Sequence, residues 1–271
     1  MRTREIRKFQ DVVYAYHKEH GRIFPWRKTK NPYRIFVSEI MLQQTQVDRV
    51  VSKYKEFLKQ FPTVEVLAKS SLAEVLRVWQ GLGYNRRARM LHEASKVLRD
   101  QYRGAIPKGR KELEGLPGVG VYTAGAVRVF AFNLPSVLIE TNIRTVYLYH
   151  FFKNKDEVAD TMLRPYIEET MDRDNPRLWY SALMDYGTYL KKSEGNVSVR
   201  SKHHTKQSCF AGSDRQIRGD IITILSNRKD SVSLSGFKKN MPHEGKRIEK
   251  QLAVLLKEGM ISTKRRGYTL G

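Results

Sequence analysis

The sequence predicts an all-α main domain followed by a small second domain. Apolar residues recur at helical spacing over most of the 271 residues, and the alternating pattern typical of β-strands is nearly absent. Proline separates several of the helical stretches, at Pro107, Pro117 and Pro135. A chain of this length can bury one large core or two modest ones.

The helices follow from these apolar stripes in chain order. The first stripe, within residues 6–16, is ended by Gly21. Pro32 begins a second helix, because the first helical turn does not need the N–H that proline lacks. Further helices are predicted over residues 46–60, 71–79, 84–101, 109–115, 122–132, 141–152, 156–171 and 177–191.

The composition changes at about residue 192. Residues 192–214 are polar, small and basic with little periodicity, which indicates a linker or an extended arm lying along an acidic partner. Three helices are predicted beyond it, followed by a basic hairpin-like end. This order resembles a winged helix-turn-helix whose wing contacts DNA, and a generic helical appendage is the alternative. The three helices span residues 214–228, 233–240 and 244–259.

The charge of the chain favours nucleic acid as its partner. Lys and Arg number 50 against 28 acidic residues, a formal net charge of +22. A membrane surface is the competing partner, but no apolar run approaches the ~20 residues of a spanning helix. The N-terminal residues lack the apolar stretch of a secretory signal, so we expect a cytoplasmic, nucleoid-associated protein. The single cysteine, Cys209, excludes an internal disulfide and a multi-thiolate metal site within one chain.

A glycine pair lies between two of the predicted helices, 109–115 and 122–132. Gly118 and Gly120 follow Pro117 and allow a tight turn whose backbone N–H groups point outward. A phosphate can sit against these amides and the following helix N-terminus. Most glycine pairs of this kind merely turn a corner, but the basic chain favours a helix-hairpin-helix that binds the DNA backbone without reading its sequence.

One carboxylate interrupts an otherwise apolar helix. Glu39 lies within residues 35–42, where burial should raise its pKa and let it carry a proton near neutrality. A carboxylate that simply faces solvent is the alternative. Trp26 precedes it and the amide-rich residues 43–45 follow it. Aromatic and amide side chains of this kind can wedge into a base stack and hold an extruded base.

Several segments together resemble the MutY family of adenine DNA glycosylases, in the helix-hairpin-helix superfamily shared with endonuclease III. The resemblance covers residues 22 to about 191, and its motifs have a specific order and spacing. They read "FPWR", "SEIMLQQTQV", "FPTVEVLA", "WQGLGYNRRARMLHEA" and "LPGVGVYTAGAV".

The resemblance implies a two-lobed all-α glycosylase with the DNA cleft between its lobes. The glycosylase domain would be residues 1–192, with a six-helix lobe over 22–134 and a second lobe of 1–21 with 135–192. Residues 193–213 would form a basic arm, and residues 214–271 the winged-helix-like domain. The implied reaction is base excision: the enzyme flips out a mispaired base and hydrolyses its N-glycosidic bond, with adenine opposite guanine or 8-oxoguanine as the leading substrate.

The resemblance also carries site residues onto this chain by position. Glu39 falls on the catalytic glutamate, which protonates the departing base and activates water. The intercalating pair falls on Gln44 and Tyr84. The remaining positions are the base-pocket residues Arg22, Trp26 and Leu42, and the hairpin tyrosine Tyr122.

Two departures bear on the chemistry. Bifunctional relatives have a lysine at the Tyr122 position, which forms a Schiff base; a tyrosine cannot, so we expect a glycosylase without strand-nicking activity. The family's catalytic aspartate falls on Glu140, which keeps the charge but adds a methylene. Both carboxylates of the glycosidase pattern are therefore present. A helix-capping carboxylate is the alternative role for Glu140.

Other departures affect cofactors and substrate. The family usually places four cluster-binding cysteines after the helix ending at residue 192, and this chain has none there, so we expect no required cofactor. A monovalent cation at the Gly118–Gly120 hairpin is a further candidate. We expect the winged helix to replace the family's 8-oxoguanine-reading C-terminal domain, and the resemblance places Ser181 where the family reads adenine. The expected DNA-backbone contacts are Gly118, Gly120, Tyr122, Lys202, His203, His204, Lys206, Arg265 and Arg266.

Two alternatives to adenine excision stay open at this point. One is a mismatch glycosylase that removes uracil, thymine or hypoxanthine. The other is a non-catalytic DNA-binding regulator, which retention of Glu39 and Glu140 disfavours because a binding module needs neither acid. The expected partner in the first two cases is double-stranded DNA with a mismatched or damaged base, bound by a monomer.

Overall fold

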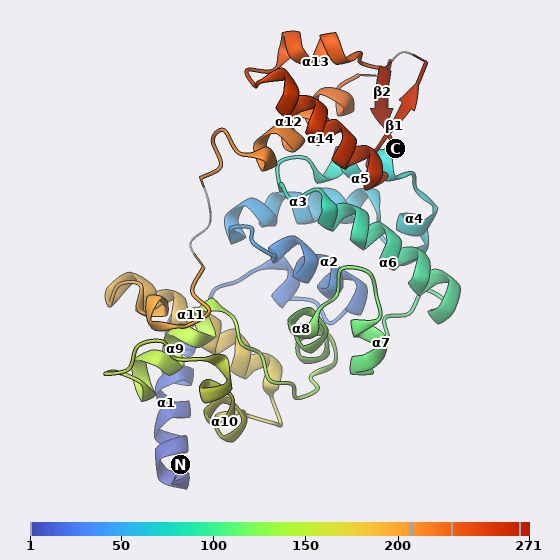
Figure 1. Cartoon of the computed structure of the whole chain (residues 1–271). Helices are drawn as coiled ribbons and strands as arrows, with labels where there is room; N and C mark the ends of the chain where they lie inside the picture. Colours follow the sequence, from blue (N-terminus) through green and yellow to red (C-terminus); the bar gives the residue numbers. More distant parts are fainter. Residues whose placement is uncertain (1, 206–208, 229, 266) are drawn as a thin grey trace. The chain divides into compact units, whose positions relative to one another are not determined.

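The computed structural model describes residues 2–205, 209–228, 230–265 and 267–271 and is mostly helical (Figure 1). The predicted all-α class is confirmed: the strands within the described ranges are the short β1 (Ile261–Lys264) and β2 (Gly267–Leu270). The chain forms two compact units. Unit 1 comprises residues 1–36, 108–115 and 119–206, and unit 2 comprises residues 37–107, 116–118 and 207–271.

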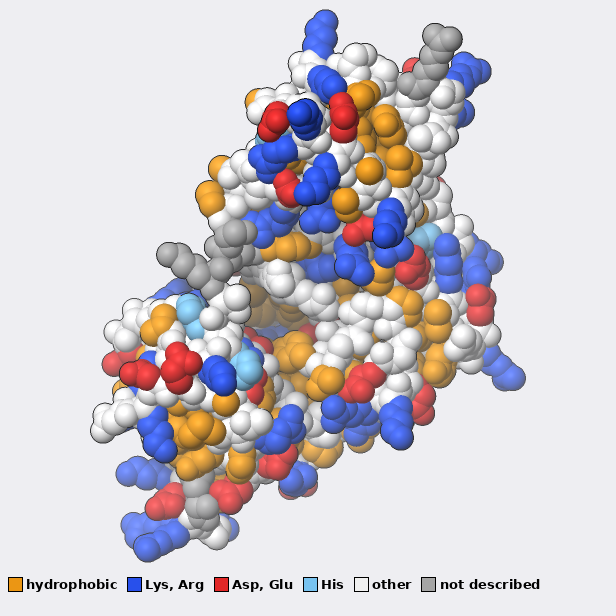
Figure 2. All heavy atoms as spheres, viewed as in Figure 1, with side chains coloured by type: hydrophobic (Ala, Val, Ile, Leu, Met, Phe, Trp, Pro, Cys, Tyr) orange, Lys and Arg blue, Asp and Glu red, His pale blue; other side chains and the backbone are white. Residues whose placement is uncertain are grey.

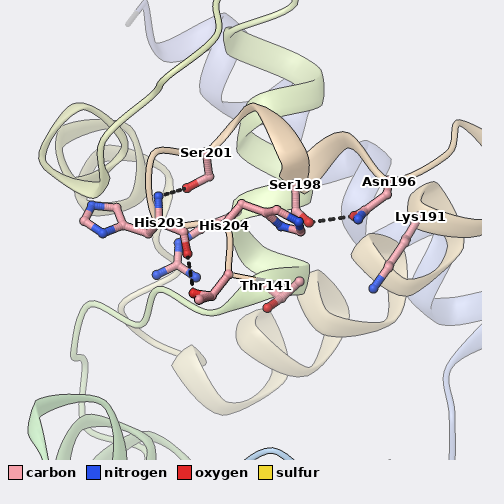
Figure 3. A pocket seen from close by; sticks show the side chains of 9 residues that line it. Thr141, Lys191, Asn196, Ser198, Ser201, His203 and His204 are labelled. Atoms are coloured by element: carbon pink, nitrogen blue, oxygen red, sulfur yellow. Dashed lines mark hydrogen bonds between the residues drawn. The ribbon is translucent and has the colours of Figure 1, made fainter. Parts of the chain in front are cut away.

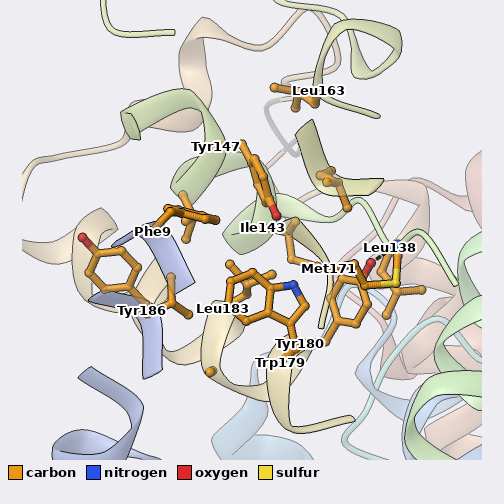
Figure 4. Close-up of a cluster of buried hydrophobic side chains, with 14 of the residues drawn as sticks. Phe9, Leu138, Ile143, Tyr147, Leu163, Met171, Trp179, Tyr180, Leu183 and Tyr186 are labelled. Atoms are coloured by element: carbon orange, nitrogen blue, oxygen red, sulfur yellow. Dashed lines mark hydrogen bonds between the residues drawn. The ribbon is translucent and has the colours of Figure 1, made fainter. Parts of the chain in front are cut away.

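Unit 1 is built around α11, which packs against α9 and α1. Aromatic side chains fill its core (Figure 4), with Phe9 lying edge-on to Trp179 at a centroid distance of 5.8 Å. The close approach of α11 to α9 depends on Gly187, because a Cβ there would meet the carbonyl oxygen of Asn142 at 2.2 Å. The helical segments of this unit are α1 (Thr3–His20), η1 (Pro25–Arg27), α7 (Arg110–Glu114), α8 (Val121–Phe132), α9 (Thr141–Phe151), α10 (Asp160–Thr170), α11 (Pro176–Ser193) and η2 (Val197–Arg200).

Unit 2 begins within α2 (Pro32–Leu42), whose first residues belong to unit 1. Its next helices are α3 (Val47–Gln60), α4 (Val64–Lys69), α5 (Leu72–Trp79) and α6 (Arg86–Tyr102), with α4 and α5 packed on α6. The sequence pattern missed α4 because six residues are too few to display a helical period. Its start is nevertheless marked locally, since the Thr63 hydroxyl accepts a hydrogen bond from the Val66 amide.

The C-terminal part of unit 2 has the predicted element order. Helices α12 (Asp214–Ser226), α13 (Leu234–Asn240) and α14 (Gly245–Lys257) are followed by the antiparallel β1–β2 hairpin, in which Ile261 pairs with Leu270. Val232 forms an additional antiparallel bridge to Tyr268. Three helices with a terminal hairpin are the elements of a winged helix-turn-helix.

The first part of the predicted linker is packed within unit 1. Val158 and Ser201 form a parallel bridge, and the guanidinium of Arg200 donates to the carbonyl oxygens of Leu148, Phe152 and Lys153. These bonds satisfy carbonyls at the C-terminal end of α9, where a helix has no acceptor partners of its own. Low periodicity in the sequence therefore reflects a short 3-10 turn, η2, and irregular backbone in residues 196–205, held by hydrogen bonds.

A buried carboxylate joins α1, the following loop and α11. Asp185 is 2 % exposed and accepts hydrogen bonds from His17 Nδ1 (2.9 Å), Arg22 Nε (2.6 Å) and Arg27 Nη1 (2.7 Å), and also from the Arg22 amide. Burial by itself raises the pKa of Asp185, but the hydrogen bonds and charges of Arg27 and Arg22 outweigh it and hold that pKa below its ordinary value.

We expect Asp185→Asn to lower the free energy of unfolding at pH 7 by about 3 kcal/mol, because it leaves two partly buried guanidinium groups without their counter-charge. A depressed folded-state pKa stabilises the protein above the unfolded-state value, and this contribution is lost as pH falls through the folded-state value. The difference between wild type and variant should therefore shrink below pH about 4. Urea unfolding across pH measures it.

Glu168→Gln is the matched control for this variant. Glu168 forms an exposed i,i+4 pair with Arg164 in the same unit, so its loss should leave the free energy of unfolding nearly unchanged. Equal effects of the two substitutions at pH 7 would contradict the anchoring role of Asp185.

Candidate active site and DNA interface

The two residues predicted to enter the base stack have the same unusual backbone conformation. Gln44 follows α2 with a φ of 54°, and Tyr84 precedes α6 with a φ of 48°. A non-glycine residue with positive φ is strained, and such strain is kept only where the surroundings enforce it. Gln44 is exposed and Tyr84 is half-buried. The structure therefore presents both side chains from two tightly held loops of unit 2.

Arg87 holds these two loops together. Its Nη1 donates to the carbonyl oxygens of Ile40 (3.0 Å), Met41 (2.7 Å) and Gln43 (2.6 Å). Its Nη2 donates to the Thr45 hydroxyl and to the carbonyls that precede Tyr84, namely those of Leu82 and Gly83.

The guanidinium of Arg87 remains charged in this setting. Burial lowers the pKa of Arg87 to about 10, which still leaves it protonated at neutral pH. Its Cζ also lies 5.5 Å from the ring centroid of Tyr84. Sequence reasoning missed this residue, because Arg86, Arg87 and Arg89 look alike in a run of basic residues.

Glu39 lies on α2 of unit 2 and is buried, with 8 % of its surface exposed. Its helical neighbours Ser38, Ile40 and Met41 are at most 1 % exposed, so the solvent-facing alternative does not describe it. Leu42, the predicted pocket residue at the end of the same helix, is half-buried. The raised pKa and the catalytic role of Glu39 stay predictions.

Glu140 is the N-cap of α9. Its Oε1 accepts hydrogen bonds from the backbone amides of Asn142 (2.9 Å) and Ile143 (3.0 Å), so the capping alternative holds for this residue. Burial raises the pKa of Glu140, and the two amides and the charge of Arg144 lower it by less. Capping fixes the position of the carboxylate and leaves its predicted catalytic role open.

The predicted base-pocket residues of unit 1 occupy defined positions. Arg22 pairs with Asp185 and also donates to the Met184 carbonyl oxygen. Trp26 is buried and stacks on Phe24 at a centroid distance of 5.2 Å. The Ser181 hydroxyl donates to the Arg177 carbonyl of its own helix at 2.8 Å, which leaves its oxygen as an acceptor.

The glycine pair forms the turn between α7 and α8, as predicted for a helix-hairpin-helix. Gly118 has a φ of 76°, and a Cβ there would lie 2.6 Å from the Cβ of Met90, so no other residue fits without movement. Gly120 is the N-cap of α8, and Tyr122 lies in its first turn. The turn therefore has the geometry that exposes backbone amides, and a cation at this hairpin stays a prediction.

On the face shown in Figure 2, basic side chains are spread widely, with acidic ones among them. Lys202, His203 and His204 follow η2 in unit 1 and are exposed. Arg265 lies at the turn of the β1–β2 hairpin with a φ of 54°. Two further predicted contacts, Lys206 and Arg266, lie outside the described residues.

Within unit 2, the C-terminal part of the chain contacts Tyr84, one of the two residues predicted to enter the base stack. Nη1 of Arg215, on α12, donates to the Tyr84 hydroxyl at 2.5 Å, and its Cζ lies 5.1 Å from the Tyr84 ring centroid. The ring of Phe210 is also within cation–π distance of Arg215, at 5.5 Å. This contact could not be anticipated from the sequence, because the two residues are 131 positions apart.

The predicted site residues are thus divided between the units. Unit 1 carries Glu140, the hairpin tyrosine and three pocket residues, and unit 2 carries Glu39 with the wedge loops. The residues do not fit an iron–sulfur cluster, because Cys209 is the one cysteine of the sequence and lies exposed. Among the described residues no group of three or more His, Cys, Asp or Glu side chains is arranged to hold a metal ion. None of the described helices has the length and apolar character needed to cross a membrane.

Comparison with known proteins supplies the family context. Residues 37–170 match the family model of the HhH-GPD superfamily base excision DNA repair proteins. The chain is 30% identical over 266 residues to an adenine DNA glycosylase of Mycolicibacterium smegmatis, covering 92% of this chain and 91% of that one. It is 36% identical over 183 residues to an adenine DNA glycosylase of Buchnera aphidicola, covering 67% of this chain and 52% of that protein, about half its length.

Solved structures share the fold of the helical part. A thermostable thymine-DNA glycosylase superposes with a TM-score of 0.62 at 28% identity, covering 68% of this chain and 86% of that one. An endonuclease III–DNA complex superposes with a TM-score of 0.60 at 20% identity, covering 72% and 89% of the two chains.

We expect Arg87→Met to lower the free energy of unfolding by about 3 kcal/mol, because it removes the donor to the carbonyl oxygens of Ile40 and Met41 and the link between the two loops. Arg87→Lys should restore only part of this, since one ammonium cannot match the planar fork of a guanidinium. Chemical denaturation of the purified variants measures both effects. Arg86→Met is the control, since Arg86 is exposed on the same helix. An equal loss of unfolding free energy in that variant would show that Arg87 does not hold the two loops together.

Proposed function

Because this chain belongs to the HhH-GPD superfamily of base excision DNA repair proteins, we propose that it is a monofunctional DNA glycosylase. Its substrate would be adenine mispaired with guanine or 8-oxoguanine in double-stranded DNA. The observation that carries this proposal is a buried carboxylate, Glu39. It lies on α2, the helix that leads into the Gln44 loop held by Arg87. A binding module has no need to bury an acid at that place.

Base flipping is assigned to the loops held by Arg87. Gln44 and Tyr84 would enter the base stack and replace the stacking that the extruded nucleotide loses. Rigid loops suit this task, because a wedge that yields cannot hold the gap open. Left-handed backbone at both positions and the six hydrogen bonds of Arg87 support the assignment.

Bond cleavage is assigned to the two carboxylic groups. Glu39 would donate a proton to the departing base and then activate the attacking water. Glu140 would place its negative charge near the sugar, where positive charge develops in the transition state. The hydrogen bonds from the α9 amides hold that carboxylate in one position, which supports the role despite the additional methylene.

Strand nicking is not part of the proposed activity. Lyase chemistry requires an amine that forms a Schiff base with the sugar, and the hairpin position carries Tyr122 in its place. The product would be an intact strand with an abasic site. Backbone contacts would come from Gly118, Gly120 and the exposed cations Lys202 and Arg265, with a monomer bound to the duplex.

The choice of adenine rests on the relatives at 30% identity or more, which are named adenine DNA glycosylases. Two observations keep a pyrimidine in view. Ser181 is short for reading a base edge, and its hydrogen is already given to Arg177. A thymine-DNA glycosylase also shares the fold at 28% identity. The substrate must therefore be tested directly.

Glu39→Gln should reduce the single-turnover rate of base excision by at least about a hundredfold, because the amide can neither donate the proton nor activate water. Binding to the same duplex should stay within a few-fold of wild type. Glu56→Gln, which removes an exposed carboxylate paired with Lys53, is the control and should react at the wild-type rate. Activity of Glu39→Gln within tenfold of wild type would exclude Glu39 as the acid.

A duplex panel decides the substrate. Adenine, uracil, thymine or hypoxanthine is placed opposite guanine, 8-oxoguanine, cytosine or thymine, and abasic sites are scored after alkali. We expect excision of adenine opposite guanine and 8-oxoguanine. The panel also measures the preference between these two opposite bases.

The panel also separates the alternatives. Preferred excision of uracil or thymine opposite guanine, with adenine untouched, would replace the adenine assignment. No excision from any duplex, together with tight binding to one defined sequence, would indicate the DNA-binding regulator instead. Cleavage of the strand before alkali would contradict the monofunctional assignment.

A further inference from the structure

Unit 1 contains a polar pocket of about 290 Å³ that the proposed chemistry does not use (Figure 3). It lies beside the first residue of α9, the end of α11 and residues 201–205, which follow η2. None of the side chains that line it is acidic, and most can donate hydrogen bonds. They are Thr141, Arg144, Lys191, Asn196, Ser198, Ser201, His203, His204 and Thr205.

The walls of this pocket are fixed by hydrogen bonds. Val158 donates its amide to the Arg200 carbonyl at 3.0 Å, and the Lys202 amide donates back to Val158 at 3.1 Å. Within the wall, the Ser198 hydroxyl donates to Asn196 Oδ1 at 2.6 Å, and the His203 amide donates to the Ser201 hydroxyl at 3.1 Å (Figure 3). The pocket is therefore a built feature of the segment that stands where relatives are expected to bind a cluster.

The pocket is lined by positive charge, and one of its cationic side chains is held in a fixed orientation. Arg144 is held by Asp160 through two hydrogen bonds of 2.7 Å, from Nε and Nη2, which leaves Nη1 for another acceptor. Burial raises the pKa of Asp160, but its bond to Arg144 and the nearby charges of Arg144 and His203 outweigh it and lower that pKa. Lys191 adds a second cation from the last turn of α11.

Cations, hydroxyl groups and an amide around a small cavity are the donor set that tetrahedral oxyanions require. A metal cation is disfavoured here, because two permanent positive charges line the space and no carboxylate does. The pocket also adjoins the proposed chemistry along the chain, since Thr141 directly follows Glu140 and their Cα atoms are about 3.8 Å apart.

We propose that this pocket is a phosphate-binding site that takes one backbone phosphate of the bound DNA strand, an assignment that rests on the proposed glycosylase function. Arg144 and Lys191 supply the charge, and the Thr141 hydroxyl supplies a further hydrogen-bond donor to the phosphate oxygens. A phosphate seated there is held beside the helix capped by Glu140. The pocket thereby sets the position of the strand relative to that carboxylate.

The test is a scan of neutral methylphosphonate linkages, introduced one at a time along each strand of the preferred duplex. Binding is measured with Glu39→Gln protein, so the readout is affinity and does not depend on turnover. We expect one linkage to weaken binding by about tenfold, the loss expected for a charge-assisted contact. In the additional background of Lys191→Met that same linkage should have at most about a twofold effect, because the contact is already weakened.

Lys192→Met is the matched control, because Lys192 is the exposed neighbour on the same helix and does not line the pocket. It should preserve the full effect of the sensitive linkage. The salt slope of binding should fall by about 0.9 in Lys191→Met relative to this control. If no linkage shows coupling to Lys191, DNA is not the source of the phosphate.

A second arm identifies the source in that case. Inorganic phosphate is titrated against thermal unfolding of wild type and Lys191→Met. Stabilisation of wild type alone would support the phosphate site and assign it to a free phosphate group. No coupling and no stabilisation together overturn the proposal. Failure of the glycosylase assignment appears separately, as a duplex panel without excision.

Discussion

A single guanidinium holds the part of the molecule on which the proposed base flipping depends. Arg87 donates six hydrogen bonds to the end of α2 and to the loop before α6. Without these bonds the carbonyls of Ile40 and Met41 would lose this donor, and the loops that hold Gln44 and Tyr84 at positive φ would lose their link. The planar fork of arginine suits this role, because it reaches several oxygens at once while keeping its charge.

Three carboxylates have different environments, and these environments separate their roles. Asp185 is surrounded by two guanidinium groups and a histidine, which hold it ionised and make it structural. Glu140 receives two backbone amides, yet burial still raises its pKa. Glu39 is buried among apolar neighbours on α2, and its proposed role as proton donor rests on that setting. The same type of group thus has a structural role at Asp185 and proposed catalytic roles at Glu39 and Glu140.

Residues 196–205 and the C-terminal helices differ more from what the family resemblance implies than the preceding helices do. Without cluster cysteines, residues 196–205 are ordered by the carbonyl contacts of Arg200 and by the bridge to Val158. The C-terminal helices also contact the loop before α6, because Arg215 on α12 contacts the ring and hydroxyl of Tyr84. Both changes bring positive charge next to positions where DNA is proposed to bind, which is consistent with the net charge of +22.

The sequence by itself determined the all-α class, most helix positions, the glycine turn and the burial of Glu39. These follow from short-range rules: apolar periodicity, the conformational freedom of Gly118, and a carboxylate set among apolar neighbours. Only the tertiary structure decided which arginine of the run 86–89 turns inward, what Asp185 pairs with, and how residues 196–205 pack. Each of these joins groups distant in the sequence, and a charged side chain shows no periodicity that distinguishes a buried pair from a solvated one.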